Sequence, residues 1–448
     1  MISAGIKDNS NVSTGFSRVR LPLNASIMKD EEKLILELCK KSADKSLISS
    51  VIQINSLHWQ YFIDSIRKHK TAPYILERLL KYPVPSQSKK LLSDRCKREI
   101  AEALHNRKVI QKELARINAV FKHVGIEFIL IKGLSLSYSN VRVMGDLDIL
   151  VREEDLIRAV NELRKFNYLY VGHILNQLLN SKEKKDINLQ LSWNNQFQLK
   201  NMKNGLLLEL QTNLFERSRA YLENLDTLLD NIDFFWEHKT YNESLNCHEF
   251  SNDNLLLIMC LHCAIKRSPA NNTFVLRTII DIDNLIDNGV DWDSFIETST
   301  KFNVANFVYF SLLLTQGLIN TAIPEYVLDT LKGTCSKKQL FLTNVHLHCV
   351  NSLSRSSLVY SKLYKFFSPF IYGKSWKDRL KWILLIPVIF PPRKNMARYF
   401  GLKENSPLIY GTYLLNPFRW LYMIVSNIAT HIEHQISGIS KRKQSDST

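Results

Sequence analysis

The sequence predicts an α+β fold, a mixed sheet with helices that is flanked by N-terminal helices and a C-terminal all-α domain. Three observations lead to this class. Apolar residues recur every three or four positions in 30–121 and again after residue 250, which is typical of helices. Between these regions, short apolar runs alternate with an amphipathic segment, as expected for strands and a helix. The Asn204-Gly205 pair between two strand candidates is a strong hairpin signal.

The length and the charge of the chain limit its class. A chain of 448 residues exceeds what one hydrophobic core needs, so two or three domains are expected. Its 59 Lys and Arg residues against 43 Asp and Glu residues give a net charge of +16. This excess favours an anionic partner such as a nucleotide, a nucleic acid or an anionic membrane surface. The 7 cysteines are scattered, odd in number and not preceded by a signal peptide, which predicts reduced thiols in a cytoplasm.

The N-terminal region divides into two parts. Residues 1–29 are rich in Ser, Asn and Gly without periodicity, which predicts a disordered N-terminus. Residues 30–121 carry apolar residues at helical spacing, for example in "EEKLILELCKK", and the last of these helices stops at Gly125. We therefore expect a helical lead-in that packs on the core.

Residues 122–235 have the pattern of an α/β core. "IEFILIKG" predicts a short buried strand that ends at Gly133, and "LSLSYSN" predicts a short helix or turn. "DLDILVR" predicts a second strand and "EDLIRAVNELRKFNY" an amphipathic helix with acidic residues at its N-terminal end. "LSWNNQFQLK" and "GLLLELQTNLF" predict two further strands, joined by the Asn204-Gly205 turn, that extend the sheet.

The C-terminal half returns to helical periodicity. We expect a helical domain over 250–435 and a disordered tail over 436–448. "WILLIPVIFPP" and "PFRWLYMIVSNIATHI" are too short or too polar to reach the roughly 20 residues of a membrane-spanning helix. Basic neighbours would allow peripheral membrane contact, but packing against the core is the favoured interpretation.

Two aspartates interrupt the apolar run of the second predicted strand. Because side chains alternate along a strand, Asp146 and Asp148 face the same side, while Leu147 and Ile149 point into the core. Like charges this close repel each other unless a cation lies between them, and Mg²⁺ is the natural cation for paired oxygen ligands. The same alternation in "LLLELQ" turns Glu209 away from the leucine face of its strand, which makes it the third carboxylate candidate.

These residues carry a resemblance to a known family. "ILIKGLSLSY", "VRVMGDLDILV" and the helix "EDLIRAVNELRKFNY" resemble the uncharacterised bacterial nucleotidyltransferase family of the DNA polymerase beta-like nucleotidyltransferase superfamily. The likeness extends to the helical lead-in and to "LHCAIKR…LRTIIDIDNLI", and loosely to "YLLNPFRWLY", so that it covers 31–422. It implies a nucleotidyltransferase-type sheet and the transfer of a nucleoside monophosphate from an NTP to an acceptor, with release of pyrophosphate.

The resemblance also implies roles for individual residues. Asp146, Asp148 and Glu209 would hold Mg²⁺, with Mn²⁺ as the alternative, and Glu209 would help to deprotonate the acceptor hydroxyl. The nucleotide phosphates would meet Lys132, Gly133 and Arg142. The superfamily has Gly-Ser where this chain has Lys132-Gly133, so a lysine point charge would replace a serine contact. The family usually has Asp and, two residues later, His where this chain has Glu209 and Gln211.

Two pairs of polar residues lie four apart on the predicted helices after residue 250. His262 shares a helix face with Lys266, and Arg277 shares one with Asp281. If these helices cover the sheet, His262, Arg277 and Asp281 would line the nucleotide or acceptor pocket. A salt bridge within the helix and a satisfied buried histidine are an equally good interpretation.

Other interpretations remain open at this stage. Asp-x-Asp also occurs as turn or cap chemistry, and Lys132, Arg142 and Glu209 could be ordinary surface residues. Cys260, His262 and Cys263, together with "HLHC" at 346–349, offer zinc ligands, although cysteine in an apolar helix usually acts as a small core residue. A catalytically silent nucleotide-binding or interaction protein is the main alternative to an enzyme. The acceptor could be a small molecule, a sugar, a protein side chain or a tRNA end.

Overall fold

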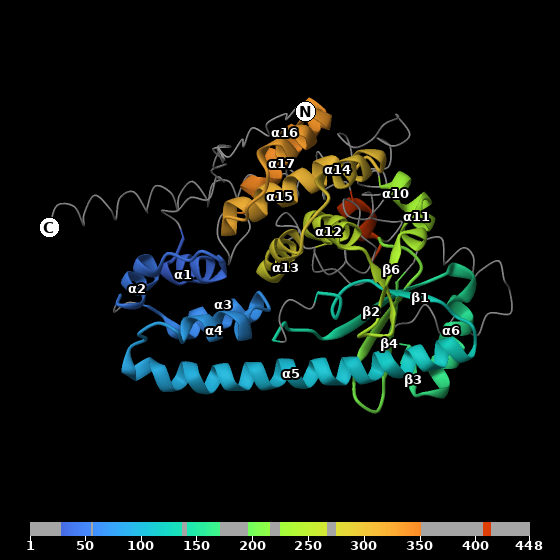
Figure 1. The fold of residues 1–448 in the computed structure, drawn as a ribbon, viewed down its shortest axis with the longest axis horizontal. Coiled ribbons are helices and arrows are strands. Elements are labelled where there is room, and N and C mark those ends of the chain that lie inside the picture. Colours follow the sequence, from blue (N-terminus) through green and yellow to red (C-terminus); the bar gives the residue numbers. More distant parts are fainter. Residues whose placement is uncertain are drawn as a thin grey trace, which may run out of the picture.

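The computed structural model describes residues 28–54, 57–136, 141–170, 196–215, 225–266, 275–350 and 406–413. In this part of the chain a seven-stranded mixed sheet lies between helices, in the strand order β3-β4-β5-β2-β1-β7-β6 (Figure 1). N-terminal helices precede the sheet strands in the sequence, and further helices follow them. The predicted α+β class is therefore confirmed.

The N-terminal part consists of helices that lead to one long helix. Ahead of the sheet come α1 (Asp30–Cys39), α2 (Lys45–Ile52), α3 (Trp59–Lys68), α4 (Ala72–Leu79) and α5 (Ser86–His123). Asp44 caps α2, because its carboxylate accepts hydrogen bonds from the backbone N–H groups of Ser46 and Leu47. Helix α5 runs along the lower border of the molecule in Figure 1, beneath the sheet.

The sheet is assembled from segments that are far apart in the sequence. Its strands are β1 (Phe128–Leu130), β2 (Asp146–Val151), β3 (Tyr168–Tyr170), β4 (Gln196–Asn201), β5 (Leu207–Gln211), β6 (Lys239–Asn242) and β7 (Cys247–Phe250). Strand β2 is central, and it pairs antiparallel with β1 and parallel with β5. Strand β4 pairs antiparallel with β5, and Gly205 in the turn between them has a φ of +76°. The predicted Asn204-Gly205 hairpin is confirmed.

The remaining elements are helices between and after the strands. Between β2 and β3 lie the short 3₁₀ turn η1 (Glu153–Asp155) and α6 (Leu156–Lys165), and before β6 lie α10 (Asp226–Asp230) and α11 (Ile232–Glu237). After β7 come α12 (Asn252–Leu261), the π-helical turn η2 (His262–Lys266), α13 (Leu276–Asp287), α14 (Trp292–Lys301), α15 (Ala305–Ile319), α16 (Glu325–Thr334) and α17 (Lys337–His348).

Two hydrophobic clusters hold the sheet between its layers. The smaller cluster packs α5 and α6 against one face of the sheet, where Leu147 and Ile149 of β2 are at most 1% exposed. The larger cluster joins α1–α4 to the helices that follow β7, and it includes Ile129 and Leu150 from the opposite face. Asp146 and Asp148 alternate with Leu147 and Ile149, so they lie on the face turned away from α5.

Three features of the sheet differ from the sequence prediction. Strand β1 ends at Leu130, so Lys132 and Gly133 lie in the turn after the strand and not within it. Gly133 has a φ of +83°, a backbone conformation that is open to glycine and that ends the extended run. The sheet also contains β3, which directly follows α6, and the β6–β7 hairpin, none of which was predicted.

Some predictions fall outside the described residues. These are the disordered N-terminus over 1–27, most of "LSLSYSN", the tail over 436–448, and both apolar segments near the C-terminus. The predicted domain boundaries at 122–235 and 250–435 stay predictions. Among the helices of the described residues, none is long and apolar enough to cross a membrane.

Candidate active site

The candidate site begins at the N-terminal end of β2. Asp148 is 1% exposed and Asp146 is half-buried, and both side chains leave the strand on the face opposite to α5. The parallel pairing of β2 with β5 places Glu209 directly across from Asp148. Strand register therefore brings the third predicted carboxylate to the first two.

The three carboxylates form one group. Asp146, Asp148 and Glu209, hereafter the carboxylate cluster, each offer an oxygen, and these oxygens all lie within 4.8 Å of one another. Among the described residues, this is the one group of three or more acidic, histidine or cysteine side chains with such spacing. A donor set made only of carboxylate oxygens suits a hard divalent cation such as Mg²⁺ or Mn²⁺. The residues present therefore fit the metal that the resemblance implies.

Lys132 reaches into the carboxylate cluster from the turn after β1. Its Nζ lies 2.9 Å from Oδ1 of Asp148, and its side chain is 18% exposed. The turn is held in place because the backbone N–H of Ile131 donates to the carbonyl oxygen of Asp148 at 3.1 Å. One positive charge thus already faces the acidic group.

Burial and the charges of neighbouring side chains shift the pKa values of Asp148 and Lys132. Burial raises the pKa of Asp148 and the nearby Glu209 raises it further, while the ammonium of Lys132 opposes both effects. For Lys132, burial alone lowers the pKa, but the carboxylates of Asp148, Asp146 and Glu209 together outweigh it, so the pKa is raised. Lys132 therefore remains a cation in this site.

Glutamine side chains from β4 and β5 support the carboxylates. Nε2 of Gln211 donates to Oδ1 of Asp148 at 3.2 Å, and Nε2 of Gln198 donates to Oε1 of Glu209 at 2.9 Å. Gln211 in turn accepts a hydrogen bond from Gln196 at 3.2 Å, which fixes the orientation of its amide. Such donors restrict the rotation of the carboxylates that they bind.

Arg142 and Asp281 form a buried pair behind this strand. Nε and Nη2 of Arg142 donate to the two carboxylate oxygens of Asp281 at 2.8 and 2.7 Å, and both side chains are at most 4% exposed. Arg277, one turn before Asp281 on α13, donates to the backbone carbonyl of Val143. The two interactions fasten the loop that leads into β2 to helix α13. A contact between Arg142 and the nucleotide stays a prediction.

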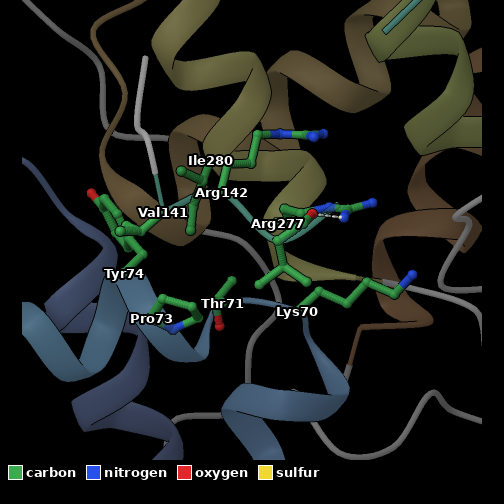
Figure 2. A pocket seen from close by; sticks show the side chains of 9 residues that line it. Lys70, Thr71, Pro73, Tyr74, Val141, Arg142, Arg277 and Ile280 are labelled. Atoms are coloured by element: carbon green, nitrogen blue, oxygen red, sulfur yellow. Dashed lines mark hydrogen bonds between the residues drawn. The ribbon is translucent and has the colours of Figure 1, made fainter. Parts of the chain in front are cut away.

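A small cavity lies beside this loop. It is lined by residues of the loop, of α13, of the turn between α3 and α4, and of the first turn of α4. Figure 2 shows Arg142 and Arg277 above Thr71 and Pro73, with Lys70 beside Thr71 and below Arg277. N-terminal helices, loop and α13 therefore meet at one place.

The remaining candidates lie on the helices that follow β7. His262 begins the turn η2 and is half-buried, and Nζ of Lys266 lies 5.9 Å from the ring centroid of Phe215, which follows β5. The role of His262 in a pocket stays a prediction. Cys260 and Cys263 are fully buried, and burial raises the pKa of Cys263 to about 12.

The zinc interpretation finds no support in the described residues. Cys260, His262 and Cys263 form no metal-binding group there. Cys349, in the second run, donates its thiol to the carbonyl oxygen of Val345. His346 stacks on Phe310 with 3.8 Å between ring centroids. These side chains act as core residues.

The glutamine side chains were not among the predicted site residues. Strand alternation already puts Gln211 on the face of Glu209, and the hairpin puts β4 beside β5, so the signal was present in the sequence. The pairing of Gln196 with Gln211 and of Gln198 with Glu209 depends on the register of the hairpin. An amide is also a common surface side chain, so composition alone does not mark it.

Comparison with known proteins identifies the family to which this protein belongs. The fold and the carboxylate cluster define an α+β protein with an acidic site on a mixed sheet, suited to a divalent cation. The model of a family described as "Uncharacterised nucleotidyltransferase" matches residues 55–320. The match covers more than half of the chain, so this protein belongs to that nucleotidyltransferase family and is an enzyme of the transferase class. No curated protein and no solved structure gives a significant match.

Proposed function

We propose that this nucleotidyltransferase moves a nucleoside monophosphate from an NTP to a hydroxyl or phosphate group of an acceptor and releases pyrophosphate, with Mg²⁺ at the carboxylate cluster. The observation that carries the proposal is the convergence of Asp146, Asp148 and Glu209 within 4.8 Å on two parallel strands of a nucleotidyltransferase family member. Phosphoryl transfer depends on positioning and on charge neutralisation, and a cluster of this kind serves both.

The three carboxylates and Lys132 differ in exposure, and we assign their roles accordingly. Asp148, fully buried and held by Gln211, is the fixed ligand, and the half-buried Asp146 and Glu209 complete the oxygen set. When bound, the cation would neutralise charge on the nucleotide phosphates and orient them for attack. The ion pair between Lys132 and Asp148 would then break, and the Lys132 ammonium would turn toward the phosphates and act there as a point charge.

The reaction conserves its atoms in a single displacement. The acceptor oxygen forms a bond to the α-phosphorus, the bond from that phosphorus to the bridging oxygen breaks, and pyrophosphate leaves. Glu209 accepts the proton of the acceptor hydroxyl, a role that its partial exposure permits. The Arg142–Asp281 pair holds the loop before β2, which keeps Asp146 and Asp148 in register.

A second candidate function is nucleotide binding without transfer. The observation in its favour is the ion pair at 2.9 Å between Lys132 and Asp148, because a lysine already supplies a cation to the carboxylates. In that case the carboxylate cluster would be neutralised by the protein itself. The two functions differ in whether labelled nucleotide is ever transferred.

The test compares transfer in matched variants. Purified protein is incubated with each labelled NTP, Mg²⁺ and cell extract, and the fraction that acquires label shows whether the acceptor is a small molecule, a sugar, a protein or a tRNA. Asp146→Asn and Asp148→Asn, as separate variants, should each abolish transfer while the protein stays folded, since each removes one metal ligand and relieves the repulsion between the two carboxylates. Asp329→Asn, at an exposed position on α16, is the control. Normal turnover in both cluster variants would refute the assignment.

The compartment is part of the same proposal. All 7 cysteines are free thiols, and 6 of them are buried. Free thiols are retained in reducing compartments. We therefore propose a cytoplasmic location, which fractionation of cells that express a tagged full-length chain would test.

A further inference from the structure

Helix α5 carries a row of lysines on the side turned away from the protein. Its buried side chains, among them Leu92, Ile110 and Phe121, pack toward the sheet and the N-terminal helices. With successive residues 100° apart around the axis, five exposed lysines fall within an arc of about 80° on the opposite side. These five, hereafter the lysine face, are Lys90, Lys97, Lys108, Lys112 and Lys122.

Acidic side chains of the described residues neutralise only a small part of the lysine face. Asp94 is the one exposed acid within the arc, so the face keeps a net charge of about +4 (five lysines less one aspartate). Of the three further acids of α5, Glu99 binds Arg67 and Arg95, and Glu113 accepts a hydrogen bond from Tyr168. The third, the exposed Glu102, lies about 80° beyond the edge of the arc. Within the part of the chain that the structure describes, no lysine of this face is in an ion pair.

This pattern differs from that of an ordinary solvated helix. Solvated helix faces usually place Glu and Lys four residues apart, where they attract each other. Asp94 has this spacing to Lys90 and Lys97, but no acid lies three or four residues from Lys108, Lys112 or Lys122. Lys108 and Lys112 are themselves four apart, so these two like charges repel each other. A partner with closely spaced negative charges would relieve this repulsion.

The row is long enough to span more than one turn of a nucleic acid duplex. From Lys90 to Lys122 the helix rises by about 48 Å, which matches the length of about 14 base pairs at 3.4 Å each. Figure 1 shows α5 as a long, nearly straight helix along the lower side of the molecule, with the tip of one strand hairpin extending below it. A straight row of cations of this length suits the phosphate backbone of a nucleic acid.

We propose that the lysine face of α5 binds the backbone of a nucleic acid without reading its sequence. A membrane surface fits less well, because an amphipathic helix binds a bilayer through a free apolar side, and the apolar side of α5 is packed into both hydrophobic clusters. The lysine face lies on the reverse of the sheet from the carboxylate cluster, so this binding does not depend on the proposed transfer reaction.

The test measures binding against salt. The full-length protein is titrated with a 20-base-pair duplex, as DNA and as RNA, by fluorescence anisotropy at 50 to 200 mM salt. With all five lysines engaged, the slope of log K against log salt should be about −4.5, a loss of affinity of about 500-fold over this range. The variant Lys97→Gln/Lys108→Gln/Lys112→Gln should reduce the slope to about −1.8, a loss of about 10-fold.

A control variant tests whether binding depends on the lysine face or only on the net charge of the protein. Lys332→Gln/Lys337→Gln/Lys338→Gln removes the same charge from exposed positions at α16 and α17. It should keep the slope and the affinity of the wild type, and thermal melting should show that both variants are folded. The proposal is overturned if the two variants weaken binding equally, if wild type binds neither duplex at 50 mM salt, or if the α5 variant loses binding only to phosphatidylserine vesicles.

Discussion

Lys132 tests the electrostatic account of the site most directly, through the variant Lys132→Met. The change keeps most of the volume of the side chain but removes the ammonium that lies 2.9 Å from Asp148. Asp148 is then a buried carboxylate next to Asp146 and Glu209, with the amide of Gln211 as its remaining described donor. Without a metal, the folded state should lose stability.

The size of the loss follows from the burial of the pair. Removing one partner of a buried ion pair costs about 3 to 5 kcal/mol. Lys132 is 18% exposed, so the lower value of about 3 kcal/mol applies. For a chain of 448 residues the shift is about 1 °C per kcal/mol, so the melting temperature in chelator should fall by about 3 °C. A divalent cation replaces the lost charge, so added Mg²⁺ should remove most of this difference.

The assay is thermal melting of wild type, Lys132→Met, Asp148→Asn and the double variant. Each protein is melted in chelator and in 10 mM Mg²⁺, a concentration about 100 times an assumed dissociation constant of ~0.1 mM. The double variant should recover most of the stability in chelator, because the unpaired carboxylate is gone. A loss for Lys132→Met that is the same with and without Mg²⁺ would refute the reasoning, as would a double variant less stable than both single ones.

The other predictions concern catalysis, the loop and pH. Glu209→Gln should keep NTP affinity in calorimetry but cut single-turnover transfer by about 10²-fold, while Glu209→Asp retains part of it. Asp281→Asn should lower unfolding free energy in urea by about 3 kcal/mol, since Arg142 stays buried, and an unchanged midpoint would contradict this. Burial lowers the pKa of His346 from 6.5 to about 3. As the pH falls below about 6.5, His346 is protonated in the unfolded chain but stays neutral in the folded one. The free energy of unfolding therefore decreases by up to about 1.4 kcal/mol per pH unit until the pH reaches about 3. His346→Phe should flatten the fall in melting temperature between pH 6 and 4.5, and an unaltered slope would count against it.

Local patterns of the sequence predicted the parts of the site that depend on one element. The alternation along β2 correctly placed Asp146 and Asp148 on one side and Leu147 and Ile149 in the core. The Asn204-Gly205 pair correctly predicted the β4–β5 hairpin. These features are set by the period of a strand and by turn chemistry, which a sequence carries directly.

Pairings between distant segments could not be predicted in the same way. Arg142 meets Asp281 across 139 positions of the chain, and nothing near either residue indicates its partner. The β6–β7 hairpin was missed because "KTYNESLNCHEF" lacks alternating apolar residues, and its first strand has no buried residue. Such strands form because β7 pairs with β1, which is a tertiary interaction.

The larger hydrophobic cluster also has a consequence for biosynthesis. Helices α1–α4 complete their packing only with helices that follow β7, as the ion pair of Lys41 with Asp283 and the hydrogen bond from Arg277 to the carbonyl of His69 illustrate. The ribosome adds about 5 to 20 residues per second, so the roughly 210 to 240 residues between these partners take about 10 to 50 s to appear. During that interval the apolar side chains of α1–α4 are exposed to solvent. We therefore expect the nascent chain to bind chaperones until the later helices have been synthesised.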